Sequence, residues 1–227
     1  MNRILSSRWT KAFLFVLCLV PAANLACGLA VSMWPHVAVF PSAMLAWGRH
    51  NDLGANPIEY VTHKTGDWTI RFLLITLCVT PFRKLLNLPK LARFRRMLGL
   101  FAFFYACLHL MTWVWFDKFF DVSELWKDVV KRRFITVGMA AFLMLVPLAI
   151  TSTAGWVRRL GFVRWQRLHR LAYFAALAGV IHYYWLVKSD VRLPLTYGAI
   201  WAALMAYRLP GWVRSKPEFG IGAKERE

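Results

Sequence analysis

Long apolar segments alternate with short charged ones along most of the chain. Six of these segments approach or exceed the roughly 18 residues that an α-helix needs to cross a bilayer. They lie at 11–34, 67–82, 97–116, 134–153, 168–187 and 194–209. The pattern predicts an all-α membrane protein, in which a bundle of six transmembrane helices forms a single domain over residues 1–227.

The connections between these segments are too short to hold a folded soluble domain. The longest, 35–66, mixes prolines and glycines with aromatic residues, which predicts a short structure at the membrane interface. The connection at 117–133 predicts one or two amphipathic turns around Val122, Leu125, Trp126 and Val129. Both connections are candidate docking surfaces for a protein outside the membrane.

Composition and charge agree with a membrane protein. Hydrophobic residues make up 59% of the chain, above the roughly 45–50% of a soluble domain. The net charge of +18 raises the question of nucleic-acid binding. With the N-terminus inside, however, 19 of the 29 Lys and Arg residues lie on the inner side, and 8 of the 11 acids lie on the outer side. This asymmetry predicts that both termini are cytoplasmic and that the basic face meets anionic lipid headgroups, not nucleic acid.

The positions of the acidic residues bear on whether the protein is a transporter, and those of the cysteines on whether it binds a metal. All 11 acids are assigned to loops, the interface or the tail, which disfavours a transporter with carboxylates at mid-membrane. A structural scaffold without a cofactor stays open. The four cysteines lie in apolar segments without metal-like pairing, so we expect them to be buried thiols.

The six histidines fall into two groups. His36, His50 and His63 lie in the predicted outer connection, where we expect solvated side chains. His109, His169 and His182 lie in predicted spans. An ionisable ring is costly to bury in hydrocarbon, so each of these three needs a partner or a task.

His109 and His182 lie at matching depths on spans that run in the same direction. His109 precedes the outer end of its span at Phe116 by 7 residues, about 10 Å, and His182 precedes Val187 by 5 residues, about 8 Å. Two imidazoles at equal depth are the arrangement that holds a haem iron from both sides. The alternative is that each ring bonds a neighbouring carbonyl group.

His169 lies 13 residues before His182, about 20 Å lower and about 140° around an ideal helix. It either serves a second, inner cofactor or bonds locally at the headgroup level.

An ordered set of short motifs connects the chain to a known family. The motifs are Asn56-Pro57-Ile58-Glu59, Thr65-Gly66, Thr80-Pro81 with Arg83, Arg95-Arg96-Met97-Leu98-Gly99, Arg133-Phe134-Ile135-Thr136-Val137-Gly138, Ile150-Thr151-Ser152 and Trp165-Gln166-Arg167-Leu168-His169-Arg170. With the three helical histidines, they resemble the ferric-reductase-like transmembrane domain of ferric reductases and NADPH oxidases. Within that family, they are most similar to the haem-binding subunits of bacterial protein-methionine-sulfoxide reductases.

The resemblance implies an electron conduit in the bacterial inner membrane that contains haem b. Its electrons would pass to a periplasmic molybdopterin-containing methionine-sulfoxide reductase, which repairs oxidised envelope proteins. By position, His109 and His182 correspond to the axial ligands and His169 to a third family histidine that is a possible ligand. FMN is also implied by the resemblance, without an assigned site. A transmembrane ferric or metal reductase-type cytochrome is the alternative.

Two departures from the larger family members matter. Those members hold two haems with two histidines on each helix, whereas Arg95 stands 14 residues before His109 here. The segment from Pro210 onward has no glycine-rich dinucleotide fingerprint, so we expect electrons to come from a membrane quinol or a cytoplasmic flavin reductase. The sulfoxide-reducing centre is expected on the partner, which leaves open whether this chain is itself an enzyme.

Overall fold

The computed structural model describes residues 7–33, 53 and 55–214, and these residues form helices joined by turns. The helices are α2 (Arg8–Met33), α4 (Pro57–Leu85), α5 (Ala92–Thr112), α6 (Val122–Lys131), α7 (Arg133–Ile150), α8 (Ala154–Leu160), α9 (Phe162–Leu168), α10 (Leu171–Leu186) and α11 (Arg192–Arg214). A short 3₁₀ turn, η1 (Pro89–Leu91), precedes α5, and a π-helical turn, η2 (Trp113–Asp117), continues it. The prediction of an all-α fold is confirmed for this part of the chain.

Three helical stretches in the described part of the chain are long and apolar enough to cross a membrane. They are Arg8–Met33, Pro89–Asp117 and Arg133–Ile150. The other three predicted spans correspond to α4, α10 and α11, which are helical but are not among these stretches; α10, for example, has 16 residues. The number of spans and the cytoplasmic placement of the termini therefore stay predictions.

The start of α4 differs from the prediction. The second span was expected from residue 67, but α4 begins at Pro57, so residues 57–66 are helical and not part of a loop. Asn56 caps the helix by accepting a hydrogen bond from the Glu59 amide (3.2 Å), and Pro57 suits the first turn because its missing N–H is not needed there. His63 consequently lies on a helix, although it is exposed as expected. His36 and His50 lie outside the described residues.

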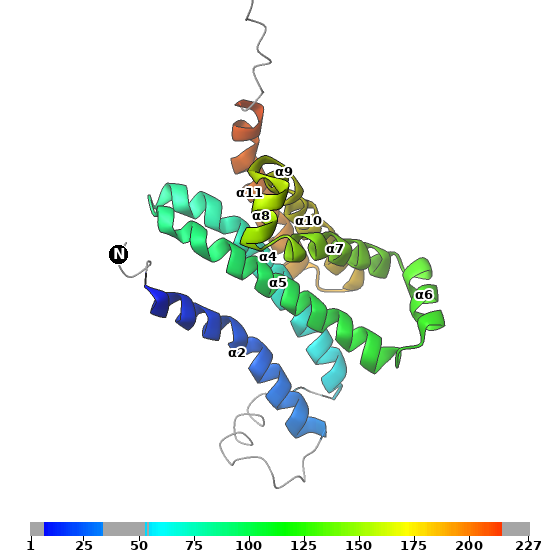
Figure 1. Cartoon of the computed structure of the whole chain (residues 1–227). Helices are drawn as coiled ribbons and strands as arrows, with labels where there is room; N and C mark the ends of the chain where they lie inside the picture. The colour runs from blue at the N-terminus through cyan, green and yellow to red at the C-terminus, as the bar shows by residue number, and fades with distance from the viewer. Residues whose placement is uncertain (1–6, 34–52, 54, 215–227) are drawn as a thin grey trace, which may run out of the picture.

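Two helix pairs form the centre of the structure. Helix α4 packs along α5, and α7 packs along α10; α2 lies beside the first pair, and α11 contacts both α4 and α10 (Figure 1). The first pair is held by stacked aromatic rings, with the ring centroid of Phe72 lying 5.2 Å from that of Tyr105 and 5.9 Å from that of Phe101.

Buried polar groups attach the outlying helices to these pairs. The hydroxyl of Tyr105, which is fully buried, accepts a hydrogen bond from the Ala22 amide (3.0 Å) and donates one to the Cys18 carbonyl (2.8 Å). These two backbone groups would normally bond each other, so the hydroxyl is inserted into the hydrogen-bond ladder of α2 beside Pro21. This contact fixes α2 against α5.

A proline in α4 explains a second buried contact. Pro81 lacks the N–H that the Leu77 carbonyl would otherwise accept within the helix. The buried guanidinium of Arg208 on α11 donates to that carbonyl and to the Leu204 carbonyl. The cationic side chain thereby satisfies a backbone group that proline leaves unpaired.

An ion-pair cluster, which we name the clasp, joins the neighbouring ends of α5 and α7. Asp128 on α6 is buried and lies 2.8 Å from Lys118 Nζ and 3.4 Å from Arg132 Nε. Lys118 follows η2 directly, and Arg132 precedes α7 directly. The helix α6 that carries Asp128 confirms the amphipathic structure predicted for 117–133.

The prediction that the four cysteines are buried thiols is confirmed in part. All four are free thiols; Cys18 and Cys27 are buried, whereas Cys78 and Cys107 are partly buried.

Replacing Asp128 with Asn should destabilise the fold by about 3 kcal/mol, because the poorly exposed Lys118 ammonium loses its close carboxylate and keeps only the exposed Asp117 at 3.9 Å. Glu124→Gln on the same helix is the matched control. Glu124 pairs with Lys127 where both side chains are about half exposed, so its loss should cost less than about 1 kcal/mol. Thermal or denaturant unfolding in lipid nanodiscs measures both.

The hydrogen bond to Asp128 raises the pKa of Lys118 above its ordinary value. The stabilisation from a raised lysine pKa is complete below the ordinary value of about 10.4 and is lost as pH rises through the folded-state pKa. The difference between the native chain and Asp128→Asn should therefore persist through neutral pH. Equal destabilisation by Asp128→Asn and Glu124→Gln would show that the clasp does not stabilise the fold.

Candidate functional site

His109 lies near the end of α5 with its ring against α4. Its Nδ1 lies 2.8 Å from the Thr62 carbonyl oxygen. A carbonyl only accepts hydrogen bonds, so Nδ1 carries the proton and Nε2 keeps its lone pair. The ring lies over Gly66, where a Cβ atom would come within 3.0 Å of His109 Cε1.

His182 on α10 is held against α7 in the same way. Its Nδ1 lies 2.6 Å from the Phe134 carbonyl oxygen, and a Cβ atom at Gly138 would come within 2.7 Å of that nitrogen. In both cases the accepting carbonyl precedes the glycine by four residues. A glycine there leaves the carbonyl open on one side, so a second donor can reach it beside the intrahelical N–H.

The two rings lie beside one another between the helix pairs, in an edge-to-face arrangement. Their centroids are 6.0 Å apart and their planes are inclined by 79°. The prediction from matched depth placed these histidines together, and the structure brings them together. Because each Nδ1 is engaged by a carbonyl, Nε2 is the nitrogen that each ring has available for a ligand.

His169 has a different environment, in the turn between α9 and α10. Its Nε2 lies 3.1 Å from Thr151 Oγ1, and that hydroxyl donates its only proton to the Pro147 carbonyl (2.6 Å). The hydroxyl must therefore accept from the histidine, so Nε2 carries the proton, in contrast to the other two histidines. Its ring packs against that of Trp165, with the centroids 4.0 Å apart and the planes inclined by 32°. Arg95 is close enough to interact electrostatically with it.

A buried polar network beside the histidine pair was missed from the sequence. Asp67, which follows Gly66, lies 2.6 Å from Arg71, accepts a hydrogen bond from the Tyr197 hydroxyl (2.8 Å), and is buried. The same hydroxyl accepts from Arg71 Nε (2.9 Å). Tyr197 also lies beside Tyr183, the residue after His182, at 6.2 Å between ring centroids.

This network corrects the assignment of all acids to loops, the interface or the tail. Asp67 was placed at the interface because it stood at the edge of the predicted span. With α4 beginning ten residues earlier than expected, Asp67 lies within the helix and is buried. Asp67 is thus a buried carboxylate within a helix, the feature whose expected absence disfavoured a transporter.

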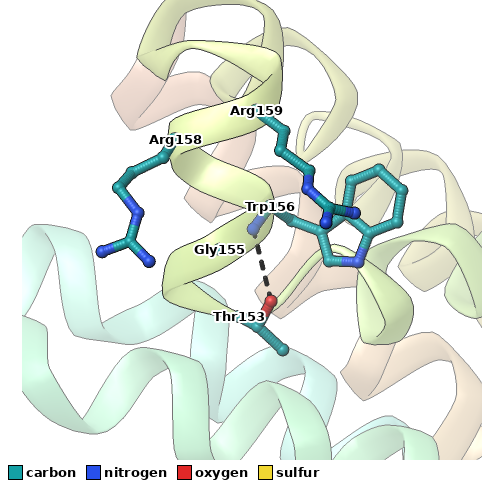
Figure 2. A pocket seen from close by; sticks show the side chains of 5 residues that line it. All are labelled: Thr153, Gly155, Trp156, Arg158 and Arg159. Atoms are coloured by element: carbon teal, nitrogen blue, oxygen red, sulfur yellow. Dashed lines mark hydrogen bonds between the residues drawn. The ribbon is translucent and has the colours of Figure 1, made fainter.

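A shallow hollow of about 460 Å³ lies near the end of the bundle that carries His169. It is lined by Thr153, Gly155, Trp156, Arg158 and Arg159. Figure 2 shows Arg159 over the Trp156 ring and Arg158 on the other side of α8. The hollow is separate from the histidine pair.

Comparison with known proteins identifies the family of this arrangement. Residues 65–180 match the family described as ferric reductase like transmembrane component. The protein-methionine-sulfoxide reductase heme-binding subunit MsrQ of Herminiimonas arsenicoxydans is 55% identical over 179 residues, which cover 75% of this chain and 82% of that protein. The chain belongs to the MsrQ family of ferric-reductase-like membrane proteins.

Further relatives support the same assignment. MsrQ of Caulobacter vibrioides is 53% identical over 170 residues, covering 74% of this chain and 81% of its own. MsrQ of Azospira oryzae is 47% identical over 205 residues, covering 90% of this chain and 80% of its own. The resemblance predicted from short motifs is confirmed.

Asp67→Asn should lower the unfolding free energy by about 1–3 kcal/mol, because Arg71 and the Tyr197 hydroxyl each lose their carboxylate acceptor. Arg71 is 37% exposed, so the cost stays below that of a fully buried ion pair. The double variant Asp67→Asn/Arg71→Met should be less destabilised than the sum of the two single variants. Strictly additive losses in thermal unfolding would show that the pair is not coupled.

Proposed function

We propose that the chain is a haem b-containing electron-transfer subunit of the bacterial inner membrane. In this proposal, it passes electrons to a periplasmic molybdopterin-containing methionine-sulfoxide reductase that repairs oxidised envelope proteins. The relatives are named as haem-binding subunits of a methionine-sulfoxide reductase. The observation in this chain that carries the proposal is the pair of adjacent imidazoles, His109 and His182.

The chemistry of His109 and His182 fits a haem, since neutral imidazole nitrogens are common ligands of haem iron, and these two side chains would hold it. The centroids of His109 and His182 are 6.0 Å apart. Both rings are in the tautomer that offers Nε2, and both are oriented by a carbonyl group. A haem supplies a redox-active iron that takes up and releases single electrons.

The chain's own groups orient the ligands and exclude water. The carbonyls of Thr62 and Phe134 hold the two rings, and Gly66 and Gly138 give the rings room against the neighbouring helices. The packed rings of Phe72 and Tyr105 belong to the buried hydrophobic core, and they pack α4 against α5. We place both ends of the chain in the cytoplasm, with six spans in one domain over residues 1–227, as the charge asymmetry predicts.

The direction of electron flow follows from this topology. The histidine pair lies toward the outer ends of α5 and α10, so a haem there is accessible to a periplasmic acceptor. His169, with Trp165 and Arg95, lies toward the cytoplasmic ends and is the candidate entry site for electrons from a membrane quinol or a cytoplasmic flavin reductase. FMN is expected from the family resemblance alone.

His109→Ala and His182→Ala should each abolish the low-spin b-type spectrum of the purified protein while leaving membrane insertion intact. His63→Ala is the matched control, since His63 lies exposed on α4. The measurement is the visible spectrum of reduced protein against oxidised protein. Normal spectra in both single variants would exclude this pair as the ligands.

Alanine at Gly138 or Gly66 should disturb the histidine that each glycine supports. The added Cβ would lie 2.7 Å from His182 Nδ1 or 3.0 Å from His109 Cε1, so the effect should be larger at Gly138. We expect fewer haems per polypeptide and a changed midpoint potential.

Gly99→Ala is the matched control for both glycine variants. Its Cβ would lie 3.7 Å from Thr76 Cγ2, an ordinary contact, and alanine favours a helix over glycine by about 1 kcal/mol. Gly99→Ala should therefore keep its haem and its stability. If all three variants behaved alike, the glycines would not act through the histidines.

His169→Ala should retain the outer haem but slow its reduction by the donor. The guanidinium of Arg95 stays protonated and cannot donate a lone pair to iron, so we expect any inner redox site to be weaker or differently ligated than the outer one. Arg95 suits a propionate or phosphate oxygen instead. Haem counted per polypeptide tests this asymmetry. Two haems with identical bis-histidine spectra would contradict it.

A further inference from the structure

Helix α6 carries a row of large apolar side chains that are exposed in the folded chain. Val122, Trp126 and Val130 are 76%, 69% and 64% exposed, and their spacing of four residues places one on each turn of one face. Phe119, in the turn before the helix, is 80% exposed. We name Val122, Trp126 and Val130 the apolar stripe.

The other faces of α6 have different partners. Leu125 and Val129 are partly buried, and Asp128 is buried in the clasp. The exposed polar residues Glu124, Lys127 and Lys131 lie on the side of the helix away from the apolar stripe, whereas the exposed Ser123 lies beside Val130 at the edge of the stripe. Only part of the apolar side of α6 is therefore packed against the protein. The apolar stripe is left exposed within the part of the chain that the structure describes.

The position of α6 in the fold indicates what covers the stripe. The helix connects η2 to α7, and both Pro89–Asp117 and Arg133–Ile150 are long and apolar enough to cross a membrane. The clasp ties α6 to the ends of both stretches, and α6 lies at the edge of the bundle beside those ends (Figure 1). Trp115, Phe119 and Phe120, which shortly precede α6 in the chain, are exposed aromatic residues as well.

The headgroup–acyl boundary of a lipid bilayer would accommodate each of these features of α6. Tryptophan favours the headgroup region, and a helix with one apolar and one charged face lies in the plane of that region. Lysines beside the apolar side can reach phosphate groups with their ammonium ends. We propose that the apolar stripe of α6 is inserted into the headgroup–acyl boundary of the lipid bilayer, so that α6 is a membrane-surface helix whose polar face is turned to water.

The test uses nitroxide labels on the full, haem-loaded chain in phosphatidylcholine nanodiscs, with and without phosphatidylglycerol. Stripe positions are labelled in Val122→Cys, Trp126→Cys and Val130→Cys, and control positions on the polar side in Glu124→Cys and Lys131→Cys. The parent chain with its four native cysteines gives the background. Collision with molecular oxygen reports lipid, and collision with a water-soluble nickel chelate reports water.

We expect oxygen collisions to exceed nickel collisions at the stripe and the reverse at the two controls. Nickel access at Val122 and Val130 would overturn the proposal, because it would place the stripe in water. Exclusion of both reagents would also overturn it, because it would indicate a covering protein surface such as a second copy of the chain. The two valine variants keep the test valid if Trp126→Cys itself loosens the helix.

Discussion

Helices that lie in hydrocarbon cannot leave polar groups to water, so each buried donor and acceptor must find its partner inside the protein. Much of this structure follows from that constraint. The hydroxyls of Thr65, Thr69 and Thr76 bond carbonyls one turn earlier in α4. The Tyr105 hydroxyl enters the ladder of α2, and Arg208 satisfies the carbonyl that Pro81 leaves unpaired. The contacts of Tyr105 and Arg208 also join α2 and α11 to the central helix pairs. The same hydrogen bonds therefore satisfy buried polar groups and hold the helices together.

The histidines obey the same constraint, and their chemistry follows from it. A histidine that donates Nδ1–H to a backbone carbonyl has lowered its burial cost and has fixed its tautomer at the same time. His109 and His182 do this on two different helix pairs, each above a glycine. His169 donates through Nε2 to Thr151 instead. Three histidines of the same type thus have two different capacities for ligand binding, and the difference originates in which backbone or hydroxyl group lies within reach.

The sequence predicted part of this arrangement, and the limits have physical reasons. Hydrophobic length predicted the long helices and amphipathic spacing predicted α6, whereas the short helices α8 and α9 were missed. Helical rise alone placed His109 and His182 at one depth. The start of α4 was wrong because Asp67 and Lys64 interrupt the apolar run, although Asn56-Pro57 was a readable helix start. That error placed His63 in a loop and hid Asp67. The glycine contacts depend on how neighbouring helices pack, and a glycine inside an apolar helix signals close approach without saying which side chain approaches.

The histidine pair is braced from both sides by groups that belong to the chain itself. On one side, Asp67 and Arg71 on α4 bond Tyr197 on α11, which packs against Tyr183 beside His182. On the other, the clasp joins the end of the helix that carries His109 to the start of the helix whose Phe134 carbonyl holds His182. Both braces connect the two helix pairs, so they restrain the positions of the two rings relative to each other. Under the proposed function, residues braced in this way would need little rearrangement when an electron arrives or leaves, which is the rigidity that an electron-transfer site requires.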